Sequence, residues 1–516
     1  MIKLLIIKIS RYLHTSLLKF RIIKNKNENF TDLNFKQDDF INYKIVKHYV
    51  LKKDYVNNIN IPDVHTFNFL FLYQKLGGKR GIELSKKNIF LWFNKYKNFN
   101  KFPWTDSYYS KRFINLIYNY DFICSISYPK EINQINYILN FHIKRIIFET
   151  KRKEIDSTSS FDILALALIN FSKNNLKTEI NNKLKNLIFQ QVDENSMHKS
   201  YNILEHAKFL NNLIEIRNIF LFSNIEIPIF LKNNILGMTS TLKYYQHDDF
   251  SLPLFNGCNN NHNKAVQNIF NKEQFLKTKP ISKFKSGIAV YKDPNKTLFF
   301  DVVQPTSFGF HRELGASSLA IELSADGEKI ITNCGGAESG GKNPSYLKYS
   351  AAHSTIIINN TNISEIKERR TNKTFPKEVS FESRDDEEQF MLSGTHNGYL
   401  RNYRKICKRE LFINKKTNLL EGIDTIISTK SSIEKTVYNI RFHLMPEIST
   451  TVTENRKNII IKTKKNNIWM FKSNNEIVIK NSIFVKNDKA IQTSQIVIGG
   501  ITSSLKNKIK WSIEKI

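Results

Sequence analysis

The pattern of hydrophobic positions changes character near residue 280. Before that point, apolar residues recur at spacings of three and four, which is the period of a helix that buries one face. The pattern predicts helices over Leu84 to Phe99, Tyr108 to Asn119, Glu131 to Lys153, Phe161 to Phe171, Leu176 to Val192, Tyr201 to Phe222 and Pro228 to Tyr245. Helices in such a series, joined by short connections, pack naturally as antiparallel pairs.

After residue 280 the period becomes two. The stretches SGIAVYKDPNKTLFFDVV, EKTVYNIRFHLMP and NEIVIKNSIFV alternate apolar and polar residues, and turn signals such as Asp-Pro-Asn separate them. A helical half followed by a β half predicts two domains with a cleft between them. We expect a poorly defined leader over residues 1–60, a helical domain over 61–275 and a β domain over 280–516. The polar run NNNHNK and Pro280 mark the boundary.

The stretch from Ser318 to Ile358 carries the most informative pattern. It predicts a strand, a turn at Asp326-Gly327, a second strand, a Gly-rich loop and a third strand. Ala351-Ala352-His353-Ser354-Thr355 opens that third strand. His353 is therefore expected at the rim of a sheet, where loops and functional groups gather.

Composition and charge narrow the choice of partner. The 516 residues are 41% hydrophobic and 24% charged, as in an ordinary soluble globular protein. The net charge of +31 indicates an anionic partner, although the lysines are scattered along the whole chain and also fit a general compositional bias. No zinc finger, RNA-binding signature or localised basic helix indicates nucleic acid. An acidic sugar polymer fits the charge equally well.

Cysteines and the N-terminus leave the compartment open. The four cysteines lie far apart and form no CxxC pair, which indicates neither a disulfide scaffold nor a cysteine-type zinc site. The N-terminal run MIKLLIIKISRYLHTSLLKFRIIK is too short and too basic to span a bilayer, and no clear cleavage site follows it. A signal peptide and an amphipathic helix on a membrane surface remain alternatives. Both the cell envelope and the cytoplasm fit this sequence.

Several motifs together resemble a known family. The Ser318 to Ile358 stretch resembles the signature of the heparinase II/III-like C-terminal domain, which reads like GHAD, SFE, VDPG and AHNT in turn. GMTSTLKYYQHDDFSLPLFNG is similar to the end of the family's helical toroid, and QQVDENSMHKSYN resembles a turn within it. THNGYLRNYRKICKREL is similar to the sandwich further downstream. The resemblance implies an α+β multidomain fold, with an incomplete (α/α) toroid followed by an antiparallel β-sandwich.

The resemblance also implies an activity, a polysaccharide lyase that cleaves a uronic-acid-containing glycan by β-elimination. That reaction removes the C5 proton and expels the C4 oxygen, so it needs a neutralised carboxylate, a base and an acid. The catalytic candidates are His198, Tyr245 and His311; the substrate-binding candidates are Asn202, Tyr244, Arg312 and His353. Alternatives are open for three of them: a polar helix start for His198, a core aromatic for Tyr245, and a structural histidine bonded to the Asn333 loop for His353.

The same alignment argues against a metal. In some relatives, a histidine of the first motif, an aspartate of the second and the AHNT histidine bind a structural zinc. This chain places Gly315 and Asn333 at the first two positions and keeps only His353. A tetrahedral zinc site needs three or four ligands, so we expect no metal and no other cofactor. These replacements, with Ser317 where the family has aspartate, also favour a second hypothesis. The chain would then be a weak or inactive relative that binds or helps process cell-envelope polysaccharide.

Overall fold

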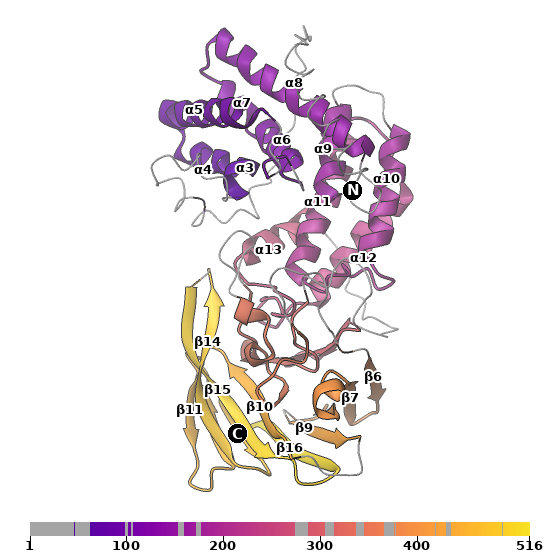
Figure 1. The fold of residues 1–516 in the computed structure, drawn as a ribbon, viewed down its shortest axis with the longest axis vertical. Coiled ribbons are helices and arrows are strands. Elements are labelled where there is room, and N and C mark those ends of the chain that lie inside the picture. The colour runs from indigo at the N-terminus through magenta and orange to yellow at the C-terminus, as the bar shows by residue number, and fades with distance from the viewer. Residues whose placement is uncertain are drawn as a thin grey trace. The chain divides into compact units, whose positions relative to one another are not determined.

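The protein is described here by a computed structural model, drawn in Figure 1. The residues described are 46, 62–98, 102–104, 107–152, 159–171, 177–273, 287–304, 314–336, 345–365, 376, 378–417, 419–429, 435–487 and 489–516. Contacts divide the chain into two compact units, one of residues 1–192 and 208–237 and one of residues 193–207 and 238–516. The boundary near residue 280 that the sequence suggested stays a prediction.

The described helices follow the predicted pattern closely. They are α3 (Pro62–Thr66), α4 (Phe69–Leu76), α5 (Gly78–Tyr96), α6 (Tyr108–Tyr118), α7 (Tyr120–Cys124), α8 (Pro129–Arg152), α9 (Ser160–Phe171), α10 (Lys177–Gln191), α11 (Ile203–Phe222), α12 (Ile229–Tyr244) and α13 (Asn263–Lys272). Each predicted helix is present, and all but α5 lie within two residues of their expected ends. Helix α5 begins at Gly78 rather than at Leu84 and ends at Tyr96. The first residues of α11 and the last residues of α12 belong to the second compact unit, together with the strands.

Helices α3, α4, α7, α13 and the short α14 (Leu400–Tyr403) were not predicted. Helix α13 occupies the polar stretch that was interpreted as a connection. Its buried side chains are Ala265, Val266 and Ile269, which lie on one face at helical spacing. Three small or aliphatic residues in a run dominated by asparagine and lysine give too weak a period to be recognised in sequence. The neighbouring Asn261 accepts a hydrogen bond from the backbone N–H of Asn487, at 2.7 Å.

The strands of the second unit form two antiparallel sheets, counting only the described residues. The first sheet has the order β1-β2-β3-β4-β10-β15-β14, with β5 paired to β10, and the second has the order β11-β12-β13-β16-β9-β8-β7-β6. The strands are β1 (Gly287–Lys292), β2 (Lys296–Val302), β3 (Ile321–Ala325), β4 (Glu328–Thr332), β5 (Ile356–Ile358), β6 (Val379–Asp385), β7 (Gln389–His396), β8 (Lys405–Asn414), β9 (Leu420–Ser428), β10 (Val437–Leu444), β11 (Ser449–Val452), β12 (Asn458–Lys462), β13 (Ile468–Ser473), β14 (Ile477–Lys486), β15 (Lys489–Ile501) and β16 (Lys506–Lys515).

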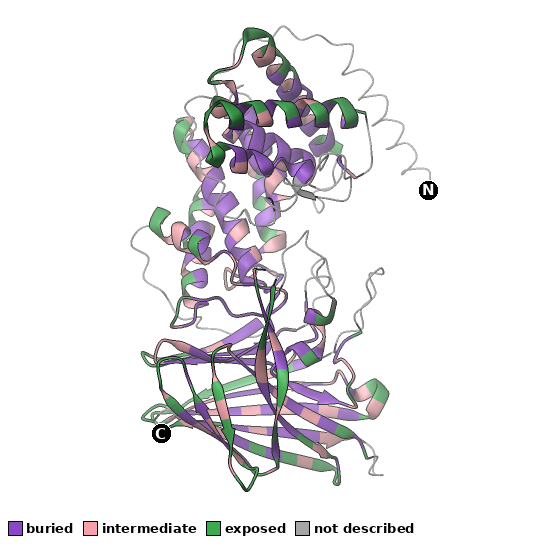
Figure 2. Ribbon diagram, turned by 90° about the vertical axis from the view of Figure 1, so that its left-hand side faces the viewer, coloured by how far each residue is buried: buried purple, intermediate pink, exposed green. Residues whose placement is uncertain are grey.

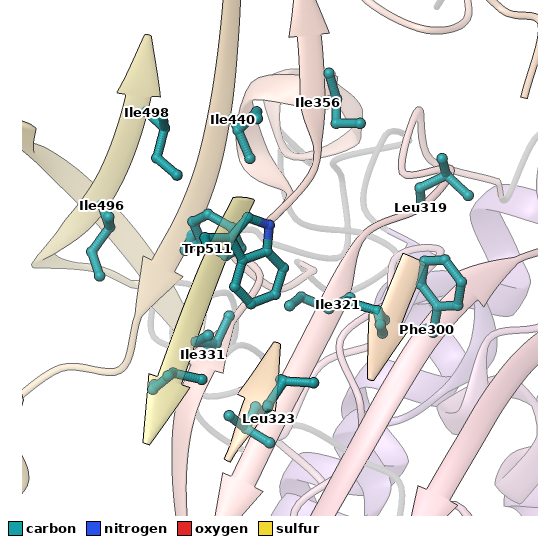
Figure 3. Close-up of a cluster of buried hydrophobic side chains, with 14 of the residues drawn as sticks. Phe300, Leu319, Ile321, Leu323, Ile331, Ile356, Ile440, Ile496, Ile498 and Trp511 are labelled. Atoms are coloured by element: carbon teal, nitrogen blue, oxygen red, sulfur yellow. The ribbon is translucent and has the colours of Figure 1, made fainter. Parts of the chain in front are cut away.

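Among the described residues, one large hydrophobic cluster takes side chains from both sheets. Along β8, buried and half-buried side chains alternate strictly, as expected of a strand with one face on a core. Figure 3 shows Trp511 of β16 among aliphatic side chains of the facing sheet, including Ile331 and Ile440. Directly opposite Trp511 in the register stands Gly422, where a Cβ would lie 2.1 Å from the indole ring. Glycine at this position makes room for the indole of Trp511.

Buried and exposed residues lie on opposite sides of the described helices and sheets. Figure 2 shows buried residues lining the inside of both the helical and the sheet layers, with exposed residues on their outer surfaces. Within the described ranges, no helix combines the length and the apolar character needed to cross a membrane. The N-terminal run considered for membrane contact lies outside the described residues.

Candidate functional site

The turn that carries His198 is shaped by an aspartate. The carboxylate of Asp193 accepts the backbone N–H groups of Asn195 and Met197, at 2.9 and 2.8 Å. Its own backbone N–H donates to the carbonyl of Met197, at 2.8 Å. An aspartate that bonds to the backbone two residues ahead is a common way to fix a turn. The result is a closed loop between α10 and α11 that holds His198 in one place.

His198 itself is a neutral hydrogen-bond donor in this arrangement. Its Nδ1 lies 2.8 Å from the Ser200 hydroxyl and accepts the Ser200 backbone N–H at 3.3 Å. Because a backbone N–H can only donate, Nδ1 is the acceptor and the ring hydrogen lies on Nε2. Burial lowers the pKa of His198 to about 4, against a smaller opposing effect of Glu205. The imidazole is therefore neutral at pH 7, with its ring hydrogen on Nε2.

Asn202 has a structural task in addition to its predicted place at the site. Its side-chain oxygen accepts the backbone N–H groups of Leu204 and Glu205, at 3.0 and 3.2 Å, which caps the start of α11. Its side-chain nitrogen donates to the carbonyl oxygen of Asn256, at 3.0 Å. Both ends of the amide are thus engaged, and they tie the His198 turn to the loop that follows α12.

Asn256 extends this connection to the glycine that replaces the family's histidine. It has a positive φ of 53°, which asparagine tolerates better than most residues. Its side chain accepts the backbone N–H of Gly315 at 3.1 Å and donates to the carbonyl of Tyr201 at 3.3 Å. Sequence reasoning missed this residue, although the Asn-Gly pair at 256–257 is a typical signal for a left-handed backbone.

His353 lies directly against Gly315. A Cβ placed on Gly315 would be only 3.1 Å from Nε2 of His353, so the ring packs on glycine backbone. Among the described residues, neither ring nitrogen of His353 has a hydrogen-bond partner, and the residue is 2% exposed. Burial lowers its pKa to about 4, opposed by the charge of Glu322. The expected side-chain bond to the Asn333 loop is therefore wrong. The backbone N–H of Ser354 makes that bond instead, at 2.9 Å to the Asn333 side chain.

The tyrosine pair divides into a buried and a half-buried member. The Tyr245 hydroxyl donates to the carbonyl of Ile288 at 2.6 Å, and burial raises its pKa well above the ordinary value. Electrostatic effects of Asp193 and Tyr201 on Tyr245 place the pair beside the His198 turn. Tyr244 is only half-buried, and its ring packs edge-on against Tyr245. Tyr244 therefore presents the more accessible phenol. His311 and Arg312 lie outside the described residues.

Comparison with known proteins supports the family resemblance. The family described as "Heparinase II/III-like, C-terminal" matches residues 277–512. This part of the chain is a heparinase II/III-like C-terminal domain. The solved structure of heparinase III aligns over 98% of this chain and 90% of its own, at 12% identity and a TM-score of 0.75. A heparan sulfate lyase from Pedobacter heparinus aligns over 98% and 88%, at 13% identity and a TM-score of 0.60. No curated protein matches the chain in sequence.

These likenesses confirm the predicted fold class. The α+β architecture, with a helical part followed by an antiparallel β-sandwich, is shared with both solved structures. At identities of 12% and 13% the likeness concerns the fold, and the chemistry of the site has to be argued from this chain's own residues.

The residues at the heparinase-like zinc position do not fit a metal. Gly315 offers no side chain, and its backbone fills the space next to Nε2 of His353. The amide of Asn333 is engaged at both ends, donating to Glu322 at 3.1 Å and accepting from Ser354 at 2.9 Å. Within the described ranges, no group of three or more His, Cys, Asp or Glu side chains is placed to hold a metal ion. The available donors amount to a single imidazole, which is too few for zinc.

Arg409 of β8 supports the candidate site from the facing sheet. Its guanidinium donates to both oxygens of Asp424, at 2.6 and 2.9 Å, and both side chains are fully buried. Its remaining Nη1 donates to the carbonyls of Leu319 and Ser354, at 2.8 and 2.9 Å. One side chain thus joins the backbone at Leu319, just before β3, to the backbone at Ser354, next to His353. Sequence reasoning missed this residue, since one basic residue within an alternating strand resembles any outward-facing charge.

Replacing Arg409 with methionine should destabilise the second unit strongly. The change leaves the carboxylate of Asp424 buried without its cation and frees two buried carbonyl oxygens. Loss of one partner of a buried ion pair costs about 3–5 kcal/mol. The neighbouring Lys408 is the matched control, because it carries the same charge, is half-buried and forms an ion pair with Glu410, at 2.7 Å.

Chemical denaturation of the full-length protein measures both effects. Lys408→Met should cost less than about 1 kcal/mol, as for exposed pairs. Equal losses for the two variants would contradict the structural role assigned to Arg409.

Proposed function

We propose that the protein is a polysaccharide lyase-like enzyme that cleaves an acidic, uronic-acid-containing glycan by β-elimination. The match to the heparinase II/III-like domain and the fold of the two solved lyase-type structures support this proposal. The observation that carries it is the neutral N–H of His198, fixed in its turn and linked through Asn202 and Asn256 to the Gly315 segment. The net charge of +31 suits a polyanionic substrate.

In the proposed reaction, His198 donates from Nε2 to the uronate carboxylate and so lowers the cost of removing the C5 proton. A donor aimed at developing negative charge is often the largest single contribution to such a step. Tyr244 supplies the phenol that protonates the departing C4 oxygen, because the hydroxyl of Tyr245 is committed to Ile288. His311 is the candidate base and Arg312 a second contact to the carboxylate.

A second function is favoured by a separate observation. His353 is almost completely buried against Gly315, and the family's acidic positions are occupied by Ser317 and Asn333. A chain that retains the fold but has lost these groups can still bind acidic polysaccharide without cleaving it. In this case the same polar turn would serve for recognition alone.

A substrate screen separates the two functions. The full-length protein is incubated with heparan sulfate, other uronate polymers of glycosaminoglycan and alginate type, and a neutral glucan as control. Elimination produces an unsaturated uronate, which is followed by its ultraviolet absorbance. The lyase proposal expects absorbance with at least one uronate polymer and none with the glucan. Co-sedimentation with a uronate polymer without any absorbance would establish the binding function instead.

A further inference from the structure

One buried carboxylate gathers the segments around the heparinase-like motifs. Glu322 of β3 accepts two bonds from Asn333, at 3.0 Å from the backbone N–H and 3.1 Å from the amide, and one from the Thr332 hydroxyl at 3.3 Å. These bonds all end on Oε1. Its other oxygen lies 2.9 Å from Nζ of Lys329 and 2.9 Å from Nε2 of His247. Each carboxylate oxygen is therefore fully used.

The carboxylate is held as an anion in spite of its burial. Glu322 and Lys329 are almost completely inaccessible, at 0% and 1% side-chain exposure. Burial alone would raise the pKa of Glu322, but Lys329 and His247 outweigh it and lower the pKa to about 2. Lys329 also donates to the carbonyl of Leu252 at 3.1 Å. The ion pair thus joins β3 and β4 to the segment that follows α12.

A short chain of bonds leads from this ion pair to His353. Glu322 fixes Asn333, and the Asn333 side chain accepts the backbone N–H of Ser354 at 2.9 Å. The Ser354 hydroxyl returns to the carbonyl of Thr332 at 2.6 Å. The backbone N–H of Cys334 also donates to the carbonyl of Ala352, at 2.9 Å. The residues on both sides of His353 are thus fastened to the loop that Glu322 organises.

We propose that the Glu322–Lys329 ion pair is a metal-independent anchor that holds the His353 segment in the place where relatives use zinc. The donor set at the metal position does not fit an ion, while Glu322 fixes Asn333, whose side chain accepts the backbone N–H of Ser354 next to His353. Glu322 acts here through Asn333 and is a positioning residue. The proposal concerns stability and metal content, so its test needs no substrate and is independent of the proposed reaction.

The test compares melting temperatures of full-length variants with and without a chelator, together with elemental analysis. Wild type should contain no stoichiometric zinc and should melt at the same temperature under chelator. Glu322→Gln should lower the melting temperature by roughly 6–20 °C, because Lys329 is left buried without its anion. The matched control is Glu421→Gln, the same change at an exposed carboxylate of β9, which should shift the melting temperature by roughly 2 °C at most.

A double variant removes both charges of the pair, and it should fold even where Glu322→Gln does not. Removing both charges in Glu322→Gln/Lys329→Met should lower the melting temperature by less than the sum of the single changes, since no unpaired charge remains. Strict additivity would overturn the anchor. Stoichiometric zinc in wild type, lost under chelator with a fall in melting temperature, would overturn it as well.

Asn333→Asp tests whether a remnant of the metal site survives. This change restores the residue type of the family but places a second carboxylate 3.1 Å from Glu322 and removes a donor from it. The anchor predicts a lower melting temperature that added zinc does not restore. Stoichiometric zinc binding by Asn333→Asp, with recovery of the wild-type melting temperature, would contradict it.

Discussion

Replacing His198 with alanine should lower kcat on a confirmed uronate substrate by about 10²–10⁴-fold, the usual contribution of a well-placed proton donor or acceptor. The physical reason is the fixed Nε2–H, which only an imidazole held through Nδ1 by Ser200 can present. The turn itself depends on the carboxylate of Asp193, so it should survive the change with little loss in melting temperature. Steady-state kinetics and thermal melting of the same preparation measure the two effects.

His353→Ala is the contrasting variant. The imidazole of His353 makes no hydrogen bond to any described residue and packs against Gly315, so its removal leaves a cavity next to the anchored loop. Its loss should lower stability at least as much as activity. If His198→Ala turned over a confirmed substrate at a near-normal rate, the assignment of the 193–202 turn to the active site would be wrong.

Acidification from pH 7 to pH 5 should destabilise the protein by on the order of 10 kcal/mol, about 2 kcal/mol for each buried histidine. Burial lowers the pKa of a set of histidines below the ordinary value of about 6.5: His142, His198, His206, His247, His353, His396 and His443. Each stays neutral in the folded protein and gains a proton on unfolding. Its stabilising effect is present above about pH 6.5 and is lost as the pH falls toward the folded pKa.

The size of this effect follows from linkage. Between the unfolded and folded pKa values, each such histidine contributes about 1.4 kcal/mol of lost stability per pH unit. Asp301 acts in the opposite direction, because burial raises its pKa to about 7, so its protonation favours the folded state as the pH falls. One aspartate offsets only one histidine.

Denaturant melts at a series of pH values test this prediction. The free energy of unfolding should be nearly flat from pH 7 to pH 8 and fall steeply below pH 6.5. A flat profile down to pH 5 would show that the buried histidines are charged, or accessible to water, in the folded protein.

The fold was predictable from sequence because it depends on periodicity. Helices of the length of α8 or α11 repeat the three-four spacing often enough to be recognised, and strands such as β8 alternate without interruption. Helix α13 was missed because its apolar face has three residues only. Short elements in polar surroundings depend on contacts that the local sequence does not reveal.

The site was predictable only in part, for a different reason. His198 and His353 could be selected because they stand in motifs, but their state depends on residues far away in sequence. Glu322 bonds to His247 across 75 positions, and Arg409 bonds to Leu319 across 90. A charged residue in an alternating strand gives no local sign that it faces inward. We expected the His353 side chain to bond to the Asn333 loop, but the backbone N–H of the next residue, Ser354, makes this bond. Sequence patterns do not resolve such a shift by one residue.

Cleavage of a uronate polymer in heavy-oxygen water is the most direct test of the proposed reaction. In β-elimination the C4 oxygen leaves with the departing sugar and a double bond forms, so no solvent oxygen enters either new chain end at the moment of cleavage. The account predicts products that carry an unsaturated uronate and no heavy oxygen by mass spectrometry. Products with one heavy oxygen per cleavage and no unsaturation would identify a hydrolase and contradict the account.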